Sequence, residues 1–260
     1  MKLFSIISLV LIWPMLAGAG AVTFGGGVSI GQATIGGTTA AANVTNGLVG
    51  WWKFDGGTSG SISNGTTVGF EDASGSGNNG TAKNSNGTGM AWTTGQISGA
   101  VSFDGVDDYV RIPSGFANTI VGNNNHSVSS WFKANSFGQT VLLGADIPTY
   151  YLQFNGATGF YVQVGAVYRT YTLLSSLTTG QWHHVAFVKT GVGDLGNLYI
   201  DGVLQTSYTG SIASTPSNSV DFLIGRYTSS GYEFNGLIDD VRIYNRALTT
   251  NEITTIYNYR

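Results

Sequence analysis

Short runs in which apolar and polar residues alternate recur from about residue 48 to residue 244, and turn residues separate them. The clearest runs are LVGWWKF (48–54), AVSF (100–103), DYVRIP (108–113), SVSSWFKA (127–134), TYYLQF (149–154), GFYVQV (159–164), WHHVAFV (182–188), NLYIDG (197–202), DFLIG (221–225) and LIDDVRIY (237–244). Strands at this spacing, without helical patterns between them, predict an all-β sandwich. The segments 155–158 and 189–196 each join two such runs and predict β-hairpins.

One short helix is predicted at the C-terminus. Thr249 precedes Glu252 by three residues, which is the spacing of a helix capping box. Ile253, Ile256 and Tyr257 then recur at helical spacing, so one face of this helix can pack on the sandwich.

Composition supports this fold class and excludes several functions. The 260 residues include 39 Gly, 6 Trp, 13 Tyr and 13 Phe but only 10% charged residues, which favours strands and turns around an aromatic core. A net charge of −3 offers no electrostatic attraction to nucleic acid. Without cysteine, the chain has neither disulfides nor thiolate metal sites, so oxygen or histidine must hold any metal.

The N-terminus predicts export. Lys2 precedes an apolar run, and Ala17-Gly18-Ala19 fits a cleavage site, so residues 1–19 are predicted to be a signal peptide. A membrane helix is the alternative, but the run contains Pro14 and is shorter than the ~20 residues that span a bilayer.

Residues 20–46 are rich in Gly, Ala and Thr and uncharged, which predicts a linker, although a short extra strand or an interaction segment also fits. Residues 47–260 then form one domain.

The order of the motifs resembles the laminin-G-like or concanavalin A-like jelly-roll domains of secreted bacterial proteins. The resemblance covers about residues 47–257 and rests on GLVGWWKFDG, EDASGSGNNGTA, AVSFDGVDDYVRIP, SVSSWFKA, GQWHHVAFV, LYIDGVL, FLIGR and FNGLIDDVRIYNRALTTNEI. It implies a two-sheet antiparallel jelly-roll sandwich in which the first and last strands are adjacent. It implies fold more firmly than function, because such sandwiches host lectins, adhesion modules and glycan-cleaving enzymes.

Two adjacent aspartates interrupt the last predicted strand. Strand alternation places Asp239 in phase with Val241 and Ile243, where a carboxylate needs a partner, and a cation is the simplest one. The same alternation places Asp240 in phase with Arg242, which indicates either an ion pair or an exposed position. The resemblance implies a structural calcium where the terminal strands meet, with Asp239 at the matching position.

Asp55 and Asp72 complete the predicted calcium site. Asp55 ends the first predicted strand, and Asp72 opens DASGSGNNG, whose glycine-rich backbone can offer carbonyl oxygens. Calcium takes six to eight oxygen ligands at flexible geometry, which suits such separated loops. The alternative is that both residues only end strands and begin turns, as Asp commonly does.

The candidate catalytic residues do not form a known pattern. The glutamates Glu71, Glu233 and Glu252 lie far apart, whereas the glucanases that this fold resembles carry an E-x-D-x-(x)-E run on one strand. The segment from Gln181 to His183 matches only part of the pattern of polysaccharide lyases with this architecture. The pair at 107–108 indicates a turn rather than a catalytic dyad. We therefore predict that the domain is not an enzyme.

The hairpin over residues 150–164 has the composition of a sugar-binding surface. Alternation places Tyr151 and Gln153 on one face of the first strand, and Tyr161 and Gln163 on the same face of the second. Tyr168 extends this face if the following strand has the matching phase. Aromatic rings stack on sugar C–H surfaces while amides bind hydroxyls. The alternative is that these are ordinary outer-face residues of an antiparallel sheet.

Together these features predict a secreted, non-catalytic binding module of the extracellular space or cell surface, with a structural calcium. Its expected partner is a glycan or an extracellular surface protein, without nucleic acid and without membrane insertion after signal cleavage. A protein-contacting structural domain is the second candidate. A glycan-cleaving enzyme on the same fold is the third.

Overall fold

The computed structural model describes residues 44–87, 89–113, 115–117, 125–145, 150–164, 167–191, 194–209, 221–227 and 231–259. The predicted signal peptide and residues 20–43 of the predicted linker lie outside this part of the chain. The described chain already contacts the sandwich at Val44, whose carbonyl accepts a hydrogen bond from the Tyr244 hydroxyl.

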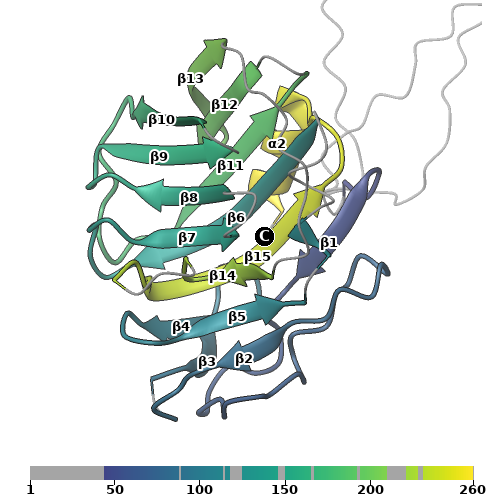
Figure 1. The fold of residues 1–260 in the computed structure, drawn as a ribbon, viewed down its shortest axis with the longest axis vertical. Helices are drawn as coiled ribbons and strands as arrows, with labels where there is room; N and C mark the ends of the chain where they lie inside the picture. Colours follow the sequence, from purple (N-terminus) through teal and green to yellow (C-terminus); the bar gives the residue numbers. More distant parts are fainter. Residues whose placement is uncertain are drawn as a thin grey trace, which may run out of the picture. The chain divides into compact units, whose positions relative to one another are not determined.

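The described residues form two antiparallel sheets and one C-terminal helix (Figure 1). The eight-stranded sheet has the order β13-β12-β11-β6-β15-β4-β3, and β1 also pairs with β15. Its strands are β1 (Leu48–Trp52), β3 (Ala91–Thr94), β4 (Gly99–Asp104), β6 (His126–Ala134), β11 (His183–Lys189), β12 (Asp194–Ile200), β13 (Val203–Thr209) and β15 (Asn235–Tyr244).

The seven-stranded sheet has the order β10-β9-β8-β7-β14-β5-β2. Its strands are β2 (Thr81–Lys83), β5 (Tyr109–Ile112), β7 (Val141–Ala145), β8 (Tyr150–Phe154), β9 (Gly159–Val164), β10 (Val167–Thr172) and β14 (Phe222–Ile224). The predicted two-sheet sandwich is therefore confirmed. Both predicted hairpins form, as β8–β9 and β11–β12, and the pairing of β1 with β15 makes the first and last strands neighbours.

The core lies between the two sheets and is dominated by aromatic rings. The ring centroids of Phe132 and Phe154 are 5.1 Å apart, and those of Phe154 and Phe160 are 4.7 Å apart. Trp52 also belongs to this core, whereas Trp51 is buried outside it, as expected for successive strand residues. Because the core takes alternate residues, the remaining side chains of each strand lie on the outer faces of the sheets.

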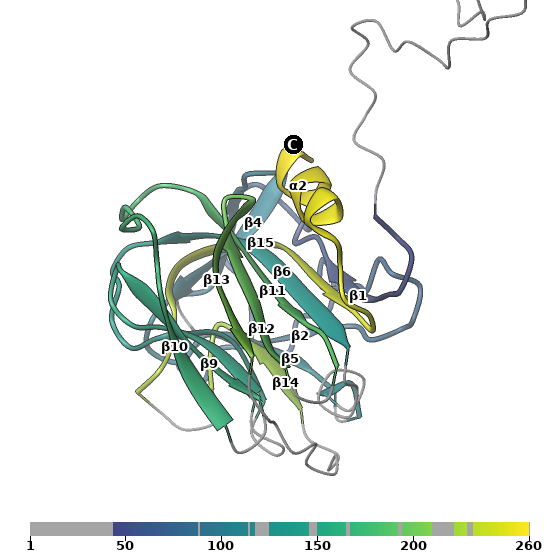
Figure 2. The same ribbon diagram turned by 90° about the horizontal axis from the view of Figure 1, so that it is seen from above.

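The helix α2 (Thr250–Asn258) lies on the outer face of the eight-stranded sheet (Figure 2). Its buried residues pack with those of β11, β12 and β15 in a second apolar cluster that consists of Ala186, Val188, Tyr199, Tyr244, Leu248, Ile253 and Ile256. The Tyr257 ring stacks on Trp131 at 5.4 Å. Trp131 is therefore buried under the helix rather than in the core between the sheets.

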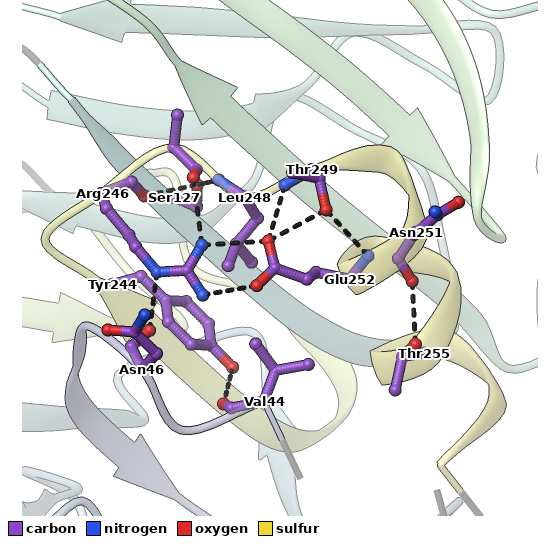
Figure 3. Close-up of polar contacts among 11 residues, drawn as sticks. Val44, Asn46, Ser127, Tyr244, Arg246, Leu248, Thr249, Asn251, Glu252 and Thr255 are labelled. Atoms are coloured by element: carbon purple, nitrogen blue, oxygen red, sulfur yellow. Dashed lines mark hydrogen bonds and ion pairs between the residues drawn. The ribbon is translucent and has the colours of Figure 1, made fainter. Parts of the chain in front are cut away.

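A polar network fixes the start of α2 (Figure 3). The predicted capping box is confirmed, because the Thr249 hydroxyl accepts from the Glu252 N–H and the Glu252 carboxylate accepts from the Thr249 N–H. Arg246 makes two hydrogen bonds to the Glu252 carboxylate, at 2.6 and 2.9 Å, and donates a third to the carbonyl of Asn46. These bonds from Arg246, with those at Thr249, lower the pKa of Glu252 from 4.5 to about 2.

This pKa predicts how acid affects the domain. Because the pKa of Glu252 is lower in the folded state than in the unfolded state, its ionised carboxylate stabilises the fold above about pH 4.5. This stabilisation is lost as the pH falls toward about 2. We expect Glu252→Gln to lower the free energy of unfolding by about 1 kcal/mol at neutral pH, because it removes an ion pair at a helix cap. The loss should shrink in urea unfolding below pH 4. The exposed Glu71→Gln is the control, and an equal pH profile for both variants would contradict the assignment.

Candidate functional site

The paired aspartates lie at a β-bulge rather than in a regular strand. The register between β15 and β6 shifts between Asp239 and Arg242, and Asp240 has a left-handed φ of 49°. The core-facing residues of this region are Ile238, Val241 and Ile243, so one extra residue lies between the first two. The predicted phase, with Asp239 aligned with Val241, is wrong because regular alternation does not hold across a bulge.

Asp240 forms the center of a buried ion pair. Its carboxylate accepts two hydrogen bonds from Arg242 Nε, at 2.9 and 3.1 Å, and one from Trp51 Nε1 at 2.6 Å. The Arg242 guanidinium lies over the rings of Trp51 and Tyr259, 4.5 and 4.9 Å from their centroids. The predicted ion pair with Arg242 is confirmed, and the alternative of an exposed Asp240 is wrong. These contacts give Asp240 a structural role in the sheet.

Asp239 is fully buried and is held against the turn that joins β3 to β4. Its Oδ2 accepts a hydrogen bond from the Ile97 N–H at 2.8 Å, and Gly99 N–H donates to Asp55 Oδ1 at 3.0 Å. Asp239 Oδ1 is buried and has no hydrogen-bond partner. Burial raises the pKa of Asp239 to about 8, and the nearby charges of Asp240 and Asp55 raise it as well.

The backbone around these two carboxylates is strained. Phe54, Ser98 and Asp240 all have left-handed φ values, between 49° and 58°, and each is adjacent or close in sequence to Asp55 or Asp239. Such conformations typically cost about 1–3 kcal/mol each and cluster at functional sites. A Cβ at Gly95 would lie 2.6 Å from Asp239 Oδ2, so the turn closely surrounds the carboxylate. An orphaned carboxylate oxygen beside a second carboxylate has the chemistry of a cation ligand.

Asp72 lies apart from this pair and is saturated by hydrogen bonds. Its Oδ1 accepts from the Trp51 and Ser74 N–H groups, both at 2.9 Å, and its Oδ2 accepts from the Asn78 N–H at 3.0 Å. These bonds tie the loop after residue 70 to β1. The structure thus brings Asp239 and Asp55 to one turn but does not join Asp72 to them in a three-carboxylate group.

A different acidic cluster occupies the turn between β4 and β5. One carboxylate oxygen from each of Asp104, Asp107 and Asp108 lies within 4.8 Å of the others, the only such group in the part of the chain described here. Asp108 is fully buried, and burial together with the charges of Asp104 and Asp107 raises its pKa to about 7. The pattern at 107–108 predicted a turn and did not predict the cluster, although DGVDD contains three of only 14 acidic residues.

The adjacent histidines His183 and His184 of β11 both contact neighbouring residues. His183 Nδ1 lies 2.8 Å from Asp201 Oδ2, and the Thr178 N–H donates to His183 Nε2 at 3.2 Å. Both ring nitrogens of His183 therefore have a hydrogen-bond partner. His184 is fully buried and contacts the Trp131 ring.

The predicted Tyr–Gln hairpin forms on the outer face of the seven-stranded sheet. Tyr151 pairs with Gln163, and Gln153 pairs with Tyr161, while Leu152 and the other alternate residues belong to the core. Both tyrosines and Gln163 are partly exposed, whereas Gln153 is mostly buried and donates to the Gln139 carbonyl. The structure therefore brings these four predicted residues together.

The remaining predicted residue, Tyr168, lies on β10. Its backbone pairs with that of Gln163, directly beside the hairpin, while its side chain falls outside the described part of the structure. We name the surface formed by Tyr151, Gln153, Tyr161 and Gln163 the tyrosine face.

The segment that joins β14 to β15 extends the tyrosine face. The Tyr227 ring contacts Tyr151 edge to face at 5.6 Å, and Tyr232 contacts Tyr227 in the same manner at 6.4 Å. A Cβ at Gly144 would lie 2.9 Å from the Arg226 carbonyl, so the backbone of this segment lies close over β7. Alternation did not predict these tyrosines, because GRYTSSGYEFNG has no strand periodicity; its two tyrosines were the available clue.

Two pairs of opposite charges lie on this sheet and on the segment over it. Arg226 lies over the Tyr109 ring, with its guanidinium carbon 5.1 Å from the centroid, and its Nε is 3.8 Å from Glu233. Farther along the sheet, Arg111 on β5 makes two hydrogen bonds to Asp221. The face therefore combines aromatic rings and amides with two ion pairs of balanced charge.

Comparison with known proteins assigns the family. Residues 103–254, more than half of the chain, match Laminin_G_3, described as the concanavalin A-like lectin/glucanases superfamily. The chain belongs to this family. The predicted resemblance is thus confirmed, and the Laminin_G_3 match spans both sheets and the start of α2. Among curated proteins, none matches the chain.

Solved structures with similar folds include binding and enzyme proteins. Domain 4 of AbnA, a GH43 extracellular arabinanase from Geobacillus stearothermophilus, was solved with arabinotriose; it is 26% identical at a TM-score of 0.64, covering 81% of this chain and 98% of that one. The Trypanosoma rangeli sialidase is 18% identical at a TM-score of 0.58, over 82% of this chain and 32% of that one. The binding domain of Paraclostridial Mosquitocidal Protein 1 is 16% identical at a TM-score of 0.59, over 82% of this chain and 52% of that one. The last two likenesses support the Laminin_G_3 fold alone.

Within the described residues, no helix has the length and apolar character needed to cross a membrane.

Proposed function

We propose that this protein is a secreted, non-catalytic carbohydrate-binding module whose ligand lies on the tyrosine face. The observation that carries the proposal is the set of partly exposed rings of Tyr151, Tyr161, Tyr227 and Tyr232 beside Gln163 on one outer face. Rings of this kind stack on the C–H surfaces of sugars, and amides bind their hydroxyls. The likeness to an arabinanase domain solved with arabinotriose supports the same function.

The charge pattern favours a neutral glycan. Arg226 and Arg111 each have a carboxylate partner, Glu233 and Asp221, within the described structure. A glycan rich in carboxylates would have to compete with those partners, whereas a neutral sugar needs only rings and hydrogen-bonding groups. Arabino-oligosaccharides are therefore the first ligands to test.

Two observations support a role without catalysis. The glutamates lie at separate places, with Glu71 in the loop before β2, Glu233 beside Arg226 and Glu252 on α2, so they do not form the close carboxylate pair that glycosidases need. His183 is engaged at both ring nitrogens.

The predicted leader and the extracellular arabinanase relative both support export.

The experiment that tests this function is calorimetric titration with arabinotriose and a panel of neutral and uronic-acid oligosaccharides. We expect saturable binding of at least one neutral glycan, without release of reducing ends or unsaturated products on prolonged incubation. A parent protein that binds no glycan would favour the second candidate, a structural domain that contacts protein. Product release would favour the third candidate, an enzyme.

We also propose that a calcium ion binds where the terminal strands meet, with Asp239 and Asp55 as carboxylate ligands. The buried, unpartnered Asp239 Oδ1 and the strained turns beside it support this proposal. Asp72 was predicted as a third ligand, and its hydrogen bonds to Trp51, Ser74 and Asn78 favour the alternative that it shapes a turn. Backbone carbonyls and water would complete the six to eight oxygens that calcium takes.

This calcium site gives a stability prediction. A ligand that binds only the folded state raises its stability, so calcium should raise the melting temperature and a chelator should lower it. Asp239→Asn should remove one calcium from the binding stoichiometry and diminish the calcium-induced rise in melting temperature. Asp221→Asn, which changes a partly exposed carboxylate paired with Arg111, is the matched control. Unchanged stoichiometry in Asp239→Asn, measured by calorimetry, would contradict this site.

A further inference from the structure

We propose that the turn between β4 and β5 holds a second calcium ion, ligated by Asp104, Asp107 and Asp108. One carboxylate oxygen of each lies within 4.8 Å of the others. Ionised carboxylates at such separations repel one another, and none of the ion pairs in the described residues involves these three. A cation between them would compensate that repulsion.

The second observation that points to a ligand is an orphaned buried oxygen. Asp108 is fully buried, and its Oδ1 has no hydrogen-bond partner, while its Oδ2 accepts from the Asp104 N–H at 2.9 Å. Asp107 Oδ1 is likewise buried without a partner. A buried carboxylate oxygen without a donor is expensive, and metal coordination is one of the few ways to satisfy it.

The rest of the turn is already ordered, so the orphaned oxygens are held in place. Asp104 Oδ1 accepts from the Val106 N–H at 2.8 Å, and Asp107 Oδ2 accepts from the Asn86 N–H at 2.7 Å. The Asn235 side chain donates to the Asp104 carbonyl at 2.9 Å. Three separate segments therefore meet at the proposed site.

The donor set selects calcium. The group consists of three aspartates without histidine or cysteine, which suits a hard cation rather than zinc or copper. Calcium accepts irregular arrangements of six to eight oxygens and can take the remainder from carbonyls and water, whereas magnesium demands near-octahedral geometry.

The site is placed to order part of the tyrosine face. The turn crosses from the eight-stranded to the seven-stranded sheet, and Tyr109, which follows Asp108 directly, lies beneath Arg226. Asn235 belongs to β15, two residues after Glu233, the partner of Arg226. Calcium should therefore strengthen glycan binding; this consequence alone rests on the proposed function, since calcium binding itself needs no glycan.

The test is calorimetric titration of the protein with calcium chloride, together with thermal unfolding in calcium and in chelator. Asp108→Asn keeps the shape and an acceptor for the Asp104 N–H but removes the charge. We expect it to bind one calcium fewer and to gain less stability from calcium. In chelator, its melting temperature should equal or exceed that of the parent, because a buried charge has been removed. If Asp108 only stabilises the turn and binds no metal, Asp108→Asn should instead melt at a lower temperature than the parent in chelator.

Comparison of variants separates the outcomes. Asp239→Asn should keep the site in the turn, and Asp221→Asn should keep all bound calcium. If Asp108→Asn binds as many calcium ions as the parent, with equal affinity, the proposal is overturned, whatever Asp239→Asn does. Absence of calcium binding by the parent also overturns it. Glycan affinity that is equal in calcium and chelator would remove the link to the tyrosine face but would leave the proposed glycan function standing.

Discussion

Asp240→Ala should destabilise the folded protein by about 3–5 kcal/mol, the usual effect of removing one partner of a buried ion pair. Arg242 is 1% exposed and would keep its charge, with the faces of Trp51 and Tyr259 and the Tyr244 side chain beside it but without Asp240. The Trp51 indole N–H would lose its acceptor as well. Urea unfolding at neutral pH measures the change directly.

Two controls isolate the cause. Asp221→Ala breaks the exposed pair with Arg111 and should change the free energy of unfolding by less than about 1 kcal/mol. Combining Asp240→Ala with Arg242→Met removes the uncompensated charge, so the double variant should regain much of the lost stability. A single variant within about 1 kcal/mol of the parent would mean that Asp240 does not neutralise Arg242.

Tyr151→Ala and Tyr161→Ala should each weaken glycan binding by a few- to tenfold, and the double variant should weaken it further. The scale follows from aromatic contacts worth about 0.5–1.5 kcal/mol each. Neither truncation removes core packing, because the alternate residues Leu152, Phe154 and Val162 face the interior. Calorimetry with the glycan identified in the panel gives the affinity, and circular dichroism confirms folding.

Val68→Ala is the matched control for these variants, because Val68 is 73% exposed and lies in the loop before β2. It should bind like the parent. Tyr227→Ala provides a further check, since its ring contacts Tyr151 and should also contribute to binding. If both Tyr151→Ala and Tyr161→Ala bind like the parent, the tyrosine face is ordinary outer surface.

Periodicity predicted the fold because it reports which residues face the core. Alternation in β8 and β9 placed Tyr151 and Tyr161 on one face, and the structure confirms this placement, with Leu152 and Phe160 on the opposite, core-facing side. The capping box at Thr249 was also predictable, because it depends on residues only three positions apart.

Periodicity failed where the backbone departs from regular geometry. The bulge at Asp239 and Asp240 depends on pairing with β6, more than 100 residues away in sequence, so the local pattern could not reveal it. Likewise, the convergence of Asp104, Asp107 and Asp108 depends on how the turn folds. Tyr227 reaches Tyr151 only because the segment after β14 lies over β7, which is a tertiary arrangement.

The most direct test of the central claim is a map of backbone amide chemical shifts during titration with arabinotriose or the best neutral glycan of the panel. We expect the largest changes on β8, β9 and the residues around Tyr227 and Tyr232. Residues of α2 and of the eight-stranded sheet beneath it should not change. Changes centred on α2, or the absence of any change at saturating glycan, would contradict a glycan site on the tyrosine face.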